Sequence, residues 1–166
     1  MQVPIRKKET YIKPKPDPYL TEEKFVELKN KLERWQTISR PRLAEEVKRL
    51  AEMGDFSENV GYQVAKGRLR GLNQRIIELQ EHLNNAIIFS PDKNTQVVGL
   101  GHQVTIEIDG QQKTYIILGG EETNPTAGII SHNSPIGSAL IGHRIGEIIT
   151  VNINDQVKKI EIKKIA

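Results

Sequence analysis

Residues 52–63, EMGDFSENVGYQ, connect two long segments whose apolar residues recur at helical spacing. The connection holds Gly54 and two acids, Asp55 and Glu58, and it is too short for another element to cover it. Two amphipathic helices joined by so short a turn must pack antiparallel. The stretch therefore predicts a helical hairpin that carries Asp55 and Glu58 exposed at its far end.

The segment before this turn is predicted to be a helix that a proline interrupts. Thr21 suits the N-cap position, and Glu22 and Glu23 follow in the first turn, where the helix dipole favours acids. Pro41 is expected to kink the helix or restart it, because proline removes a backbone hydrogen bond. The residues predicted to face the second helix are Phe25, Leu28, Leu32, Trp35, Ile38, Leu43, Val47 and Leu50.

The segment after the turn is predicted to form a longer helix over residues 57–88, about 48 Å at 1.5 Å per residue. Ser57 is its expected N-cap. Gly67 and Gly71 each cost about 1 kcal/mol of helix stability relative to alanine, and nothing in the sequence explains them. Steps of three and four dominate the apolar residues, as in a coiled-coil seam: Val60, Val64, Leu72, Ile76, Leu79, Leu83 and Ala86.

Residues 1–20 are predicted to be a flexible basic arm, since four prolines and five Lys/Arg stand there against one Asp and one Glu. The net charge of the chain is only +3, so any basic surface is local. The absence of cysteine excludes disulfides, zinc–cysteine sites and a thiol nucleophile. No apolar run approaches the roughly 20 residues of a membrane span, and no secretory signal begins the chain. A cytoplasmic protein is expected.

The second half of the chain changes to an alternating pattern typical of strands. A linker at residues 90–97 precedes it, and Asp109–Gly110 is a hairpin turn signal. Ser134 and Pro135 begin a short predicted helix. The predicted fold is α+β: an antiparallel coiled coil over residues 21–90, then a small antiparallel-sheet domain over residues 97–166. The predicted strands are HQVTIEID, QQKTYIILGG, AGIIS, GEIITVNI and VKKIEIKKI.

Two separate motifs give the chain a family resemblance. The tip GDFSENVGYQVAK is similar to a GD-x-x-EN-x-x-Y-x-x-A-K signature, and ISHNSPIGSALIGHRIGEIITV is similar to a C-terminal signature. The stretch LTEEKFVELKNKLERW, with Arg40-Pro41 after it, resembles the first helix of the same family. Over roughly residues 19–166 the chain resembles the Gre family of bacterial transcript cleavage factors, the GreA/GreB group. The bases of KGRLRGLNQRI are closer to GreB.

The resemblance implies a coiled coil followed by an FKBP-like domain. It implies that the second domain docks on the rim of the secondary channel of bacterial RNA polymerase, and that the coiled coil enters the channel. There the factor, which is not itself an enzyme, would stimulate the polymerase to cut its own backtracked RNA. The implied partners are the polymerase and the 3′ end of the nascent RNA, with no membrane partner and with the protein as a monomer.

The resemblance also assigns roles at the tip. Asp55 and Glu58, three residues apart, would help to hold a second Mg²⁺ shared with the polymerase centre and would orient its water. Asn59 and Tyr62 would contact the RNA end or support the tip. Gly61 stands where the family commonly has an acid, and stimulation would be weaker if that acid helps to place the metal or the water. Taken without the signature, acids at a helix N-terminus are favoured by the dipole and need no function.

Two further groups are assigned away from the tip. A run of bases on the second helix, Lys66, Arg68, Arg70 and Arg75, is expected to contact backtracked RNA, although it could be only a solvated face. A loop formed by Asn133, Ser134, Pro135 and Ile136 is expected to face the polymerase, with Ala139, Leu140 and Ile141 in the core. His102, His132 and His143 lack metal-ligand spacing and are expected on the surface, and His82 on the shaft.

Three alternatives compete with this interpretation. A Gre-like factor could occupy the channel and inhibit or regulate the polymerase without efficient cleavage. A peptidyl-prolyl isomerase would need an apolar pocket lined by aromatic residues, and residues 97–166 contain one, Tyr115. A purely structural coiled-coil adaptor is the third.

Overall fold

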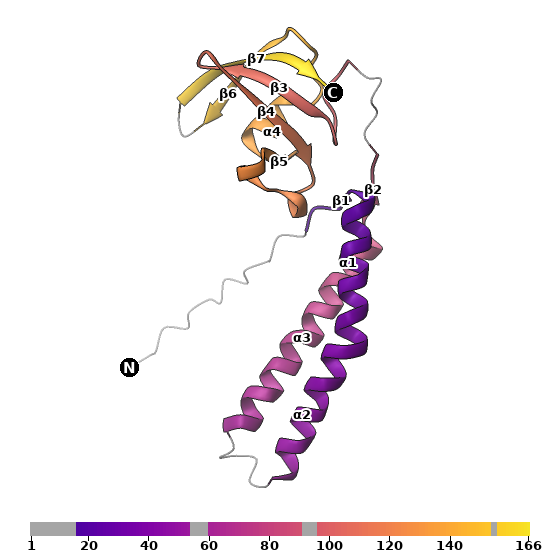
Figure 1. Ribbon diagram of the computed structural model, residues 1–166. Coiled ribbons are helices and arrows are strands. Elements are labelled where there is room, and N and C mark those ends of the chain that lie inside the picture. Colours follow the sequence, from indigo (N-terminus) through magenta and orange to yellow (C-terminus); the bar gives the residue numbers. More distant parts are fainter. Residues whose placement is uncertain (1–15, 54–59, 91–95, 154–155) are drawn as a thin grey trace, which may run out of the picture.

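The computed structural model describes residues 16–53, 60–90, 96–153 and 156–166. They form a long helical hairpin followed by a curled, mostly antiparallel sheet, so the predicted α+β fold is confirmed (Figure 1). The two limbs of the hairpin lie side by side and extend away from the sheet. No helix within these ranges is long and apolar enough to cross a membrane.

The first limb consists of α1 (Glu22–Arg34), a π-helical turn η1 (Trp35–Ser39) and α2 (Arg40–Glu52). The Thr21 side chain accepts a hydrogen bond from the Lys24 N–H at 3.2 Å, so the predicted N-cap is confirmed. α2 carries Pro41 in its first turn, where a missing N–H costs little. The backbone nevertheless stays helical from α1 through η1 into α2, with Ser39 at φ −71° and ψ −43°, so the helix is not restarted at the proline and the π-helical turn stands in its place.

The π-helical turn changes which residues face the second limb. The Arg40 N–H bonds to the carbonyl of Trp35, five residues back. This wide turn rotates the following side chains relative to a continuous α-helix, so Ile38 is 61% exposed and Ser39 is half-buried. The prediction that Ile38 belongs to the seam is wrong.

The second limb is α3 (Val60–Asn84), which packs against α1 and α2. Its buried apolar residues are Ala65, Leu72 and Ile76, spaced seven and four apart on one face. Val60 and Val64 lie off this stripe and are 74% and 47% exposed. The prediction that Val60 and Val64 are seam residues is wrong, because the buried residue of α3 nearest to its N-terminal end is Ala65.

A short parallel pair closes the root of the hairpin. β1 (Tyr19–Leu20) pairs with β2 (Ile87–Ile88), and Leu20 is completely buried. The Pro18 carbonyl accepts the Ile87 N–H at 2.7 Å. Residues 16–20 therefore belong to the folded part of the chain, in contrast to the prediction that the flexible arm extends to residue 20.

The sheet has the order β5-β4-β3-β7-β6, antiparallel except where β4 pairs with β5. Asp109 and Gly110 both adopt positive φ, 52° and 73°, in the predicted β3–β4 turn. Two 3-10 turns, η2 (Gly120–Glu122) and η3 (Pro125–Ala127), lie between β4 and β5 in the chain. α4 (Pro135–Leu140) follows β5. The strands are β3 (Gln103–Ile108), β4 (Gln111–Leu118), β5 (Ile129–Ser131), β6 (Ile148–Ile153) and β7 (Gln156–Ile165).

The core of this domain lies between the sheet and α4. Alternate strand residues point into it, as the period of two requires. Leu140 of α4 is completely buried, and Ala139 and Ile141 pack against the same cluster, as predicted. The other completely buried residues are Val104, Ile106, Ile117, Ile160 and Ile162.

Candidate functional site

The predicted acidic tip, with Asp55, Glu58 and Asn59, lies outside the described residues. The described chain borders it on both sides, since α2 ends at Glu52 and α3 begins at Val60. These two helix ends form the end of the hairpin remote from the sheet (Figure 1). From residue 22 to residue 52 the first limb is roughly 45 Å long at 1.5 Å per residue. The helix ends that border the signature stretch are therefore far from the second domain.

Tyr62, in the first turn of α3, is the predicted tip residue nearest to this end that the structure describes. The Lys66 Nζ lies 5.6 Å from the centroid of the Tyr62 ring, a cation–π distance. The two residues are one helical turn apart. The structure thus brings together a proposed tip residue and a proposed RNA-contacting residue.

The bases predicted on α3 are part of a wider feature. Lys66, Arg68, Arg70 and Arg75 are all exposed, and no acid lies between residues 59 and 77. The first limb also lacks acids over residues 34–44. A groove of about 570 Å³ is lined by residues of both runs, including Trp35, Leu43 and Arg68, so the two runs lie at the same height on the hairpin. The resulting basic belt comprises Arg34, Arg40, Arg42, Lys66, Arg68, Arg70 and Arg75.

Sequence reasoning missed the first-limb half of this belt. The signal was present, because residues 34–44 contain three arginines and no acid. The alignment of that run with the α3 run depends on the antiparallel register, which only the packed hairpin supplies. The belt thus places positive charge on both limbs in the middle of the hairpin.

The same groove is lined by the two unexplained glycines. A Cβ added at Gly67 or at Gly71 would meet no atom within 4 Å. Packing within the described chain therefore does not require either glycine.

Alanine at these positions is expected to stabilise the protein. Gly67→Ala and Gly71→Ala should each raise the free energy of unfolding by about 1 kcal/mol, because alanine costs less backbone entropy in a helix. Urea titration followed by circular dichroism measures the change. Gly137→Ala is the matched control and should destabilise, since its Cβ would lie 2.1 Å from the Ser131 carbonyl oxygen. If Gly67→Ala and Gly71→Ala also lowered the free energy of unfolding, this would contradict the open space beside these two glycines.

The predicted docking loop is held rigidly. Ser134 caps α4: its Oγ accepts the Gly137 N–H at 3.0 Å and donates to the Ser131 carbonyl at 2.7 Å. Asn133 and Pro135 are exposed, whereas Ile136 is half-buried and packs against the core. The surface that this loop offers to a partner is therefore formed mainly by Asn133 and Pro135.

Asp17, which the sequence places in the arm, forms the centre of a hydrogen-bonded junction. Its carboxylate accepts the Tyr19 N–H at 3.1 Å, the Gly120 N–H at 2.9 Å and the His132 Nε2–H at 2.7 Å. Burial acts to raise the pKa of Asp17, but the hydrogen bonds from Gly120, Tyr19 and His132 outweigh it and hold the pKa below its usual value. Asp17 is thus favoured as a carboxylate.

A second carboxylate reinforces this junction. Glu122, in η2, accepts the Thr21 N–H at 3.1 Å and also the Thr21 hydroxyl. Thr21 therefore both caps α1 and binds the sheet domain.

The predicted positions of the histidines are confirmed only in part: the His143 side chain is 42% exposed, as predicted. His102 is 3% exposed and its Nδ1 accepts the Gly99 N–H, and the His132 side chain is 17% exposed against Asp17, so their surface prediction is wrong. His82 lies on the hairpin, as predicted, but it is buried at the junction. Within residues 16–53, 60–90, 96–153 and 156–166, no group of three His or acidic residues could hold a metal ion.

Comparisons with known proteins identify the family. The family model "Transcription elongation factor, N-terminal" matches residues 18–88, and "Transcription elongation factor, GreA/GreB, C-term" matches residues 93–166. The chain is 39% identical over 150 residues to the transcription elongation factor GreA of Chloroflexus aggregans, covering 89% of this chain and 96% of that protein. It is 40% identical over 135 residues to the GreA of Geobacillus kaustophilus, covering 80% and 85%.

Among solved structures, the chain is similar to GreA factor homolog 1 (Gfh1) of Thermus thermophilus, at 29% identity and a TM-score of 0.39, with 89% of this chain and 97% of that chain covered. The family models do not separate GreA from GreB, so the closer likeness to GreB stays a prediction. Both matched regions together span nearly all of the described chain. The protein belongs to the GreA/GreB family of transcription elongation factors.

Proposed function

We propose that this protein is a transcript cleavage factor that inserts its hairpin into the secondary channel of bacterial RNA polymerase and stimulates cleavage of backtracked RNA. The observation that carries the proposal is the position of the signature stretch. Residues 54–59 connect α2 to α3 in the sequence, and the helix ends that they connect form the end of the hairpin remote from the sheet. A slender rod of two helices suits delivery of side chains into a narrow channel.

The chemistry of the tip fits a shared centre better than an independent one. Asp55 and Glu58 supply carboxylate oxygens, the donors that Mg²⁺ takes, but two are too few for a site of their own. A second Mg²⁺ in the polymerase centre would neutralise charge on the phosphodiester. Asp55 and Glu58 would help to hold that ion and to orient the attacking water, and Asn59 and Tyr62 would contact the RNA end or support the tip. The cleavage activity itself belongs to the polymerase.

The rest of the hairpin and the sheet domain serve binding in this proposal. The basic belt follows the polyanionic extruded RNA, and Asn133 and Pro135 present the surface that docks on the channel rim. The partners are the polymerase and the 3′ end of the nascent RNA, and the factor acts as a monomer. Its site of action is the cytoplasm, where bacterial transcription takes place.

A second function is favoured by one residue. Gly61 replaces the acid that the family commonly carries immediately before its tyrosine. If that acid is needed to place the water, the protein would occupy the channel and regulate the polymerase without efficient cleavage. The cleavage assay described next separates cleavage stimulation from regulation without cleavage.

The test uses arrested elongation complexes with labelled nascent RNA and Mg²⁺. Added factor is expected to produce shortened RNA with a new 3′ end that the polymerase can extend. A complex walked to an active, non-backtracked register is the control and should remain uncut. Intact RNA, together with competition against a cleavage-competent Gre factor, would support the regulatory function and contradict cleavage stimulation.

Charge reversal on the belt is expected to affect long RNA selectively. The double change Arg68→Glu and Arg70→Glu should slow cleavage of deeply backtracked complexes by about tenfold, because several phosphate contacts are replaced by repulsion. Shallow backtracks should be nearly unaffected. The double change Lys29→Glu and Arg49→Glu alters net charge equally outside the belt and is the control. Equal slowing of short and long extrusions would argue against an RNA track.

A further inference from the structure

The segment at residues 16–21 is bonded to the hairpin on one side. Besides the β1–β2 pair, the Leu20 carbonyl accepts the Phe89 N–H at 3.2 Å. The Nε2–H of His82 donates to the Asp17 carbonyl at 2.9 Å, and His82 is buried near the end of α3. The backbone of this segment is thus fixed to the root of α3.

The same segment is bonded to the sheet domain through side chains. The Asp17 carboxylate, only 7% exposed, accepts hydrogen bonds from Gly120 in η2 and from His132, and from the Asn133 amide at 3.4 Å. The Tyr19 ring meets the His132 ring edge-on at 5.4 Å. The backbones also touch, since a Cβ at Gly119 would lie 2.0 Å from the Tyr19 carbonyl oxygen.

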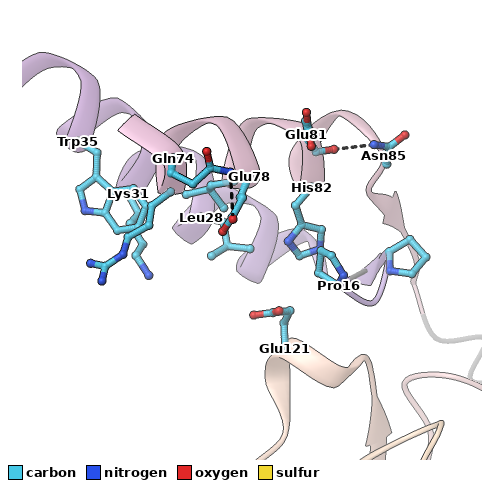
Figure 2. A pocket seen from close by; sticks show the side chains of 13 residues that line it. Pro16, Leu28, Lys31, Trp35, Gln74, Glu78, Glu81, His82, Asn85 and Glu121 are labelled. Carbon is cyan, nitrogen blue, oxygen red and sulfur yellow. Dashed lines mark hydrogen bonds between the residues drawn. The ribbon is translucent and has the colours of Figure 1, made fainter. Parts of the chain in front are cut away.

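An open space borders the junction. A groove of about 940 Å³ lies there, and Figure 2 shows Glu121 of the sheet domain facing Leu28 and His82 of the hairpin across it. Pro16 and Trp35 also line it. This space leaves room for the two parts to move relative to each other when the hydrogen bonds of the junction are broken.

We infer that Asp17 is a positioning residue that sets the direction in which the hairpin leaves the sheet domain. It does so by linking His132, and Asn133 of the docking loop, to the root of α3 through one residue. We call the hydrogen bonds of Asp17 to His132, Asn133 and His82 the latch. Its effect on cleavage rests on the proposed function, but its effect on the direction of the hairpin does not.

A small rotation at this junction displaces the far end of the hairpin by a large distance. A rotation of about 10° at the root displaces the end of a rod roughly 45 Å long by roughly 8 Å. A catalytic constellation tolerates misplacement of only about 1 Å. A loosened latch therefore costs cleavage even when the docking surface and the acidic tip are intact.

The chain contains no cysteine, so two introduced cysteines are specific sites for spin labels. Ala44→Cys on α2 and Thr150→Cys on β6 are both exposed, one on each side of the junction. Pulsed electron resonance then gives the distribution of distances between the two parts. We expect a narrow distribution in the parent protein and a broader, shifted one after Asp17→Asn or His132→Ala.

Asp109→Asn is the matched control. Asp109 pairs with Lys158 within the sheet domain, and neither residue belongs to the junction, so its loss should leave the distribution unchanged. Circular dichroism confirms that each variant is folded. An unchanged distribution in both folded variants, Asp17→Asn and His132→Ala, would overturn the latch.

The elongation complex supplies a second readout. With Asp17→Asn, cleavage at saturating factor should fall about tenfold or more, and the concentration needed for half-saturation should change little. A broadened distance distribution with an unchanged cleavage rate would overturn the positioning role. If the parent protein fails to stimulate cleavage, the proposed function fails, whereas the distance measurement still decides the latch.

Discussion

Asp55→Ala and Glu58→Ala are each expected to reduce stimulated RNA cleavage at least about a hundredfold, equivalent to about 3 kcal/mol of transition-state stabilisation. Each change removes one of the two carboxylates with which the factor would hold the second metal ion of the polymerase centre. The loss should appear in the rate at saturating factor, because neither side chain belongs to the docking surface.

The measurement is a time course of RNA shortening in arrested complexes, with competition against parent protein to report binding. Glu52→Ala is the matched control: Glu52 is an exposed acid at the end of α2, only three residues before Asp55, and outside the signature. The Glu52→Ala variant should stimulate cleavage at the same rate as the parent protein. Normal cleavage by both tip variants would show that the tip does not take part in the chemistry.

Pro135→Asp is expected to weaken binding to the polymerase by about thirtyfold, equivalent to about 2 kcal/mol at an interface hot spot. Pro135 is exposed at the start of α4, next to exposed Asn133. An aspartate there is compatible with the helix, whose N-terminus favours negative charge, so the fold is retained while the surface gains a charge.

Pro125→Asp provides the control for this change. Pro125 is also exposed at the beginning of a short helical turn, η3, in the same domain. Titration of labelled factor with polymerase gives both affinities, and the control should match the parent protein. Equal affinity of the Pro135 variant, or equal loss in both variants, would reject the docking loop.

Local patterns of the sequence predicted the elements of this fold well. The cap at Thr21, the turn at Asp109 and Gly110, and the start of α4 at Ser134 each depend on a few neighbouring residues, and each was confirmed. The alternation of buried residues likewise predicted the strands of the sheet. These features need no knowledge of distant parts of the chain.

Register within the hairpin was harder to predict. A π-helical turn at Trp35–Ser39 moves Ile38 out of the interface, and the stripe on α3 passes through Ala65 and not Val64. A small alanine can occupy the close approach of two helices, whereas hydrophobicity alone favours the larger valine. The residues that form the seam depend on how the two limbs pack against each other. The apolar pattern of either limb alone does not contain this information.

The junction could not be predicted, because its residues are distant in sequence. Asp17 and His132 are separated by 115 positions, and each taken alone is typical of a solvent-exposed residue. Their hydrogen bond follows only from the way in which β1 and η2 meet. The acidic tip, Asp55 and Glu58, lies outside the described residues, and its role stays a prediction from the signature.

The most direct measurement of the central claim places a photo-cross-linking benzoylphenylalanine at position 56, where phenylalanine stands between the tip residues. In a backtracked elongation complex, irradiation should link this position to the 3′-terminal nucleotides of the RNA, and the same probe at Thr150 of β6 should not reach them. Cross-links to the RNA from position 150 but none from position 56 would show that the hairpin does not deliver its tip to the active centre.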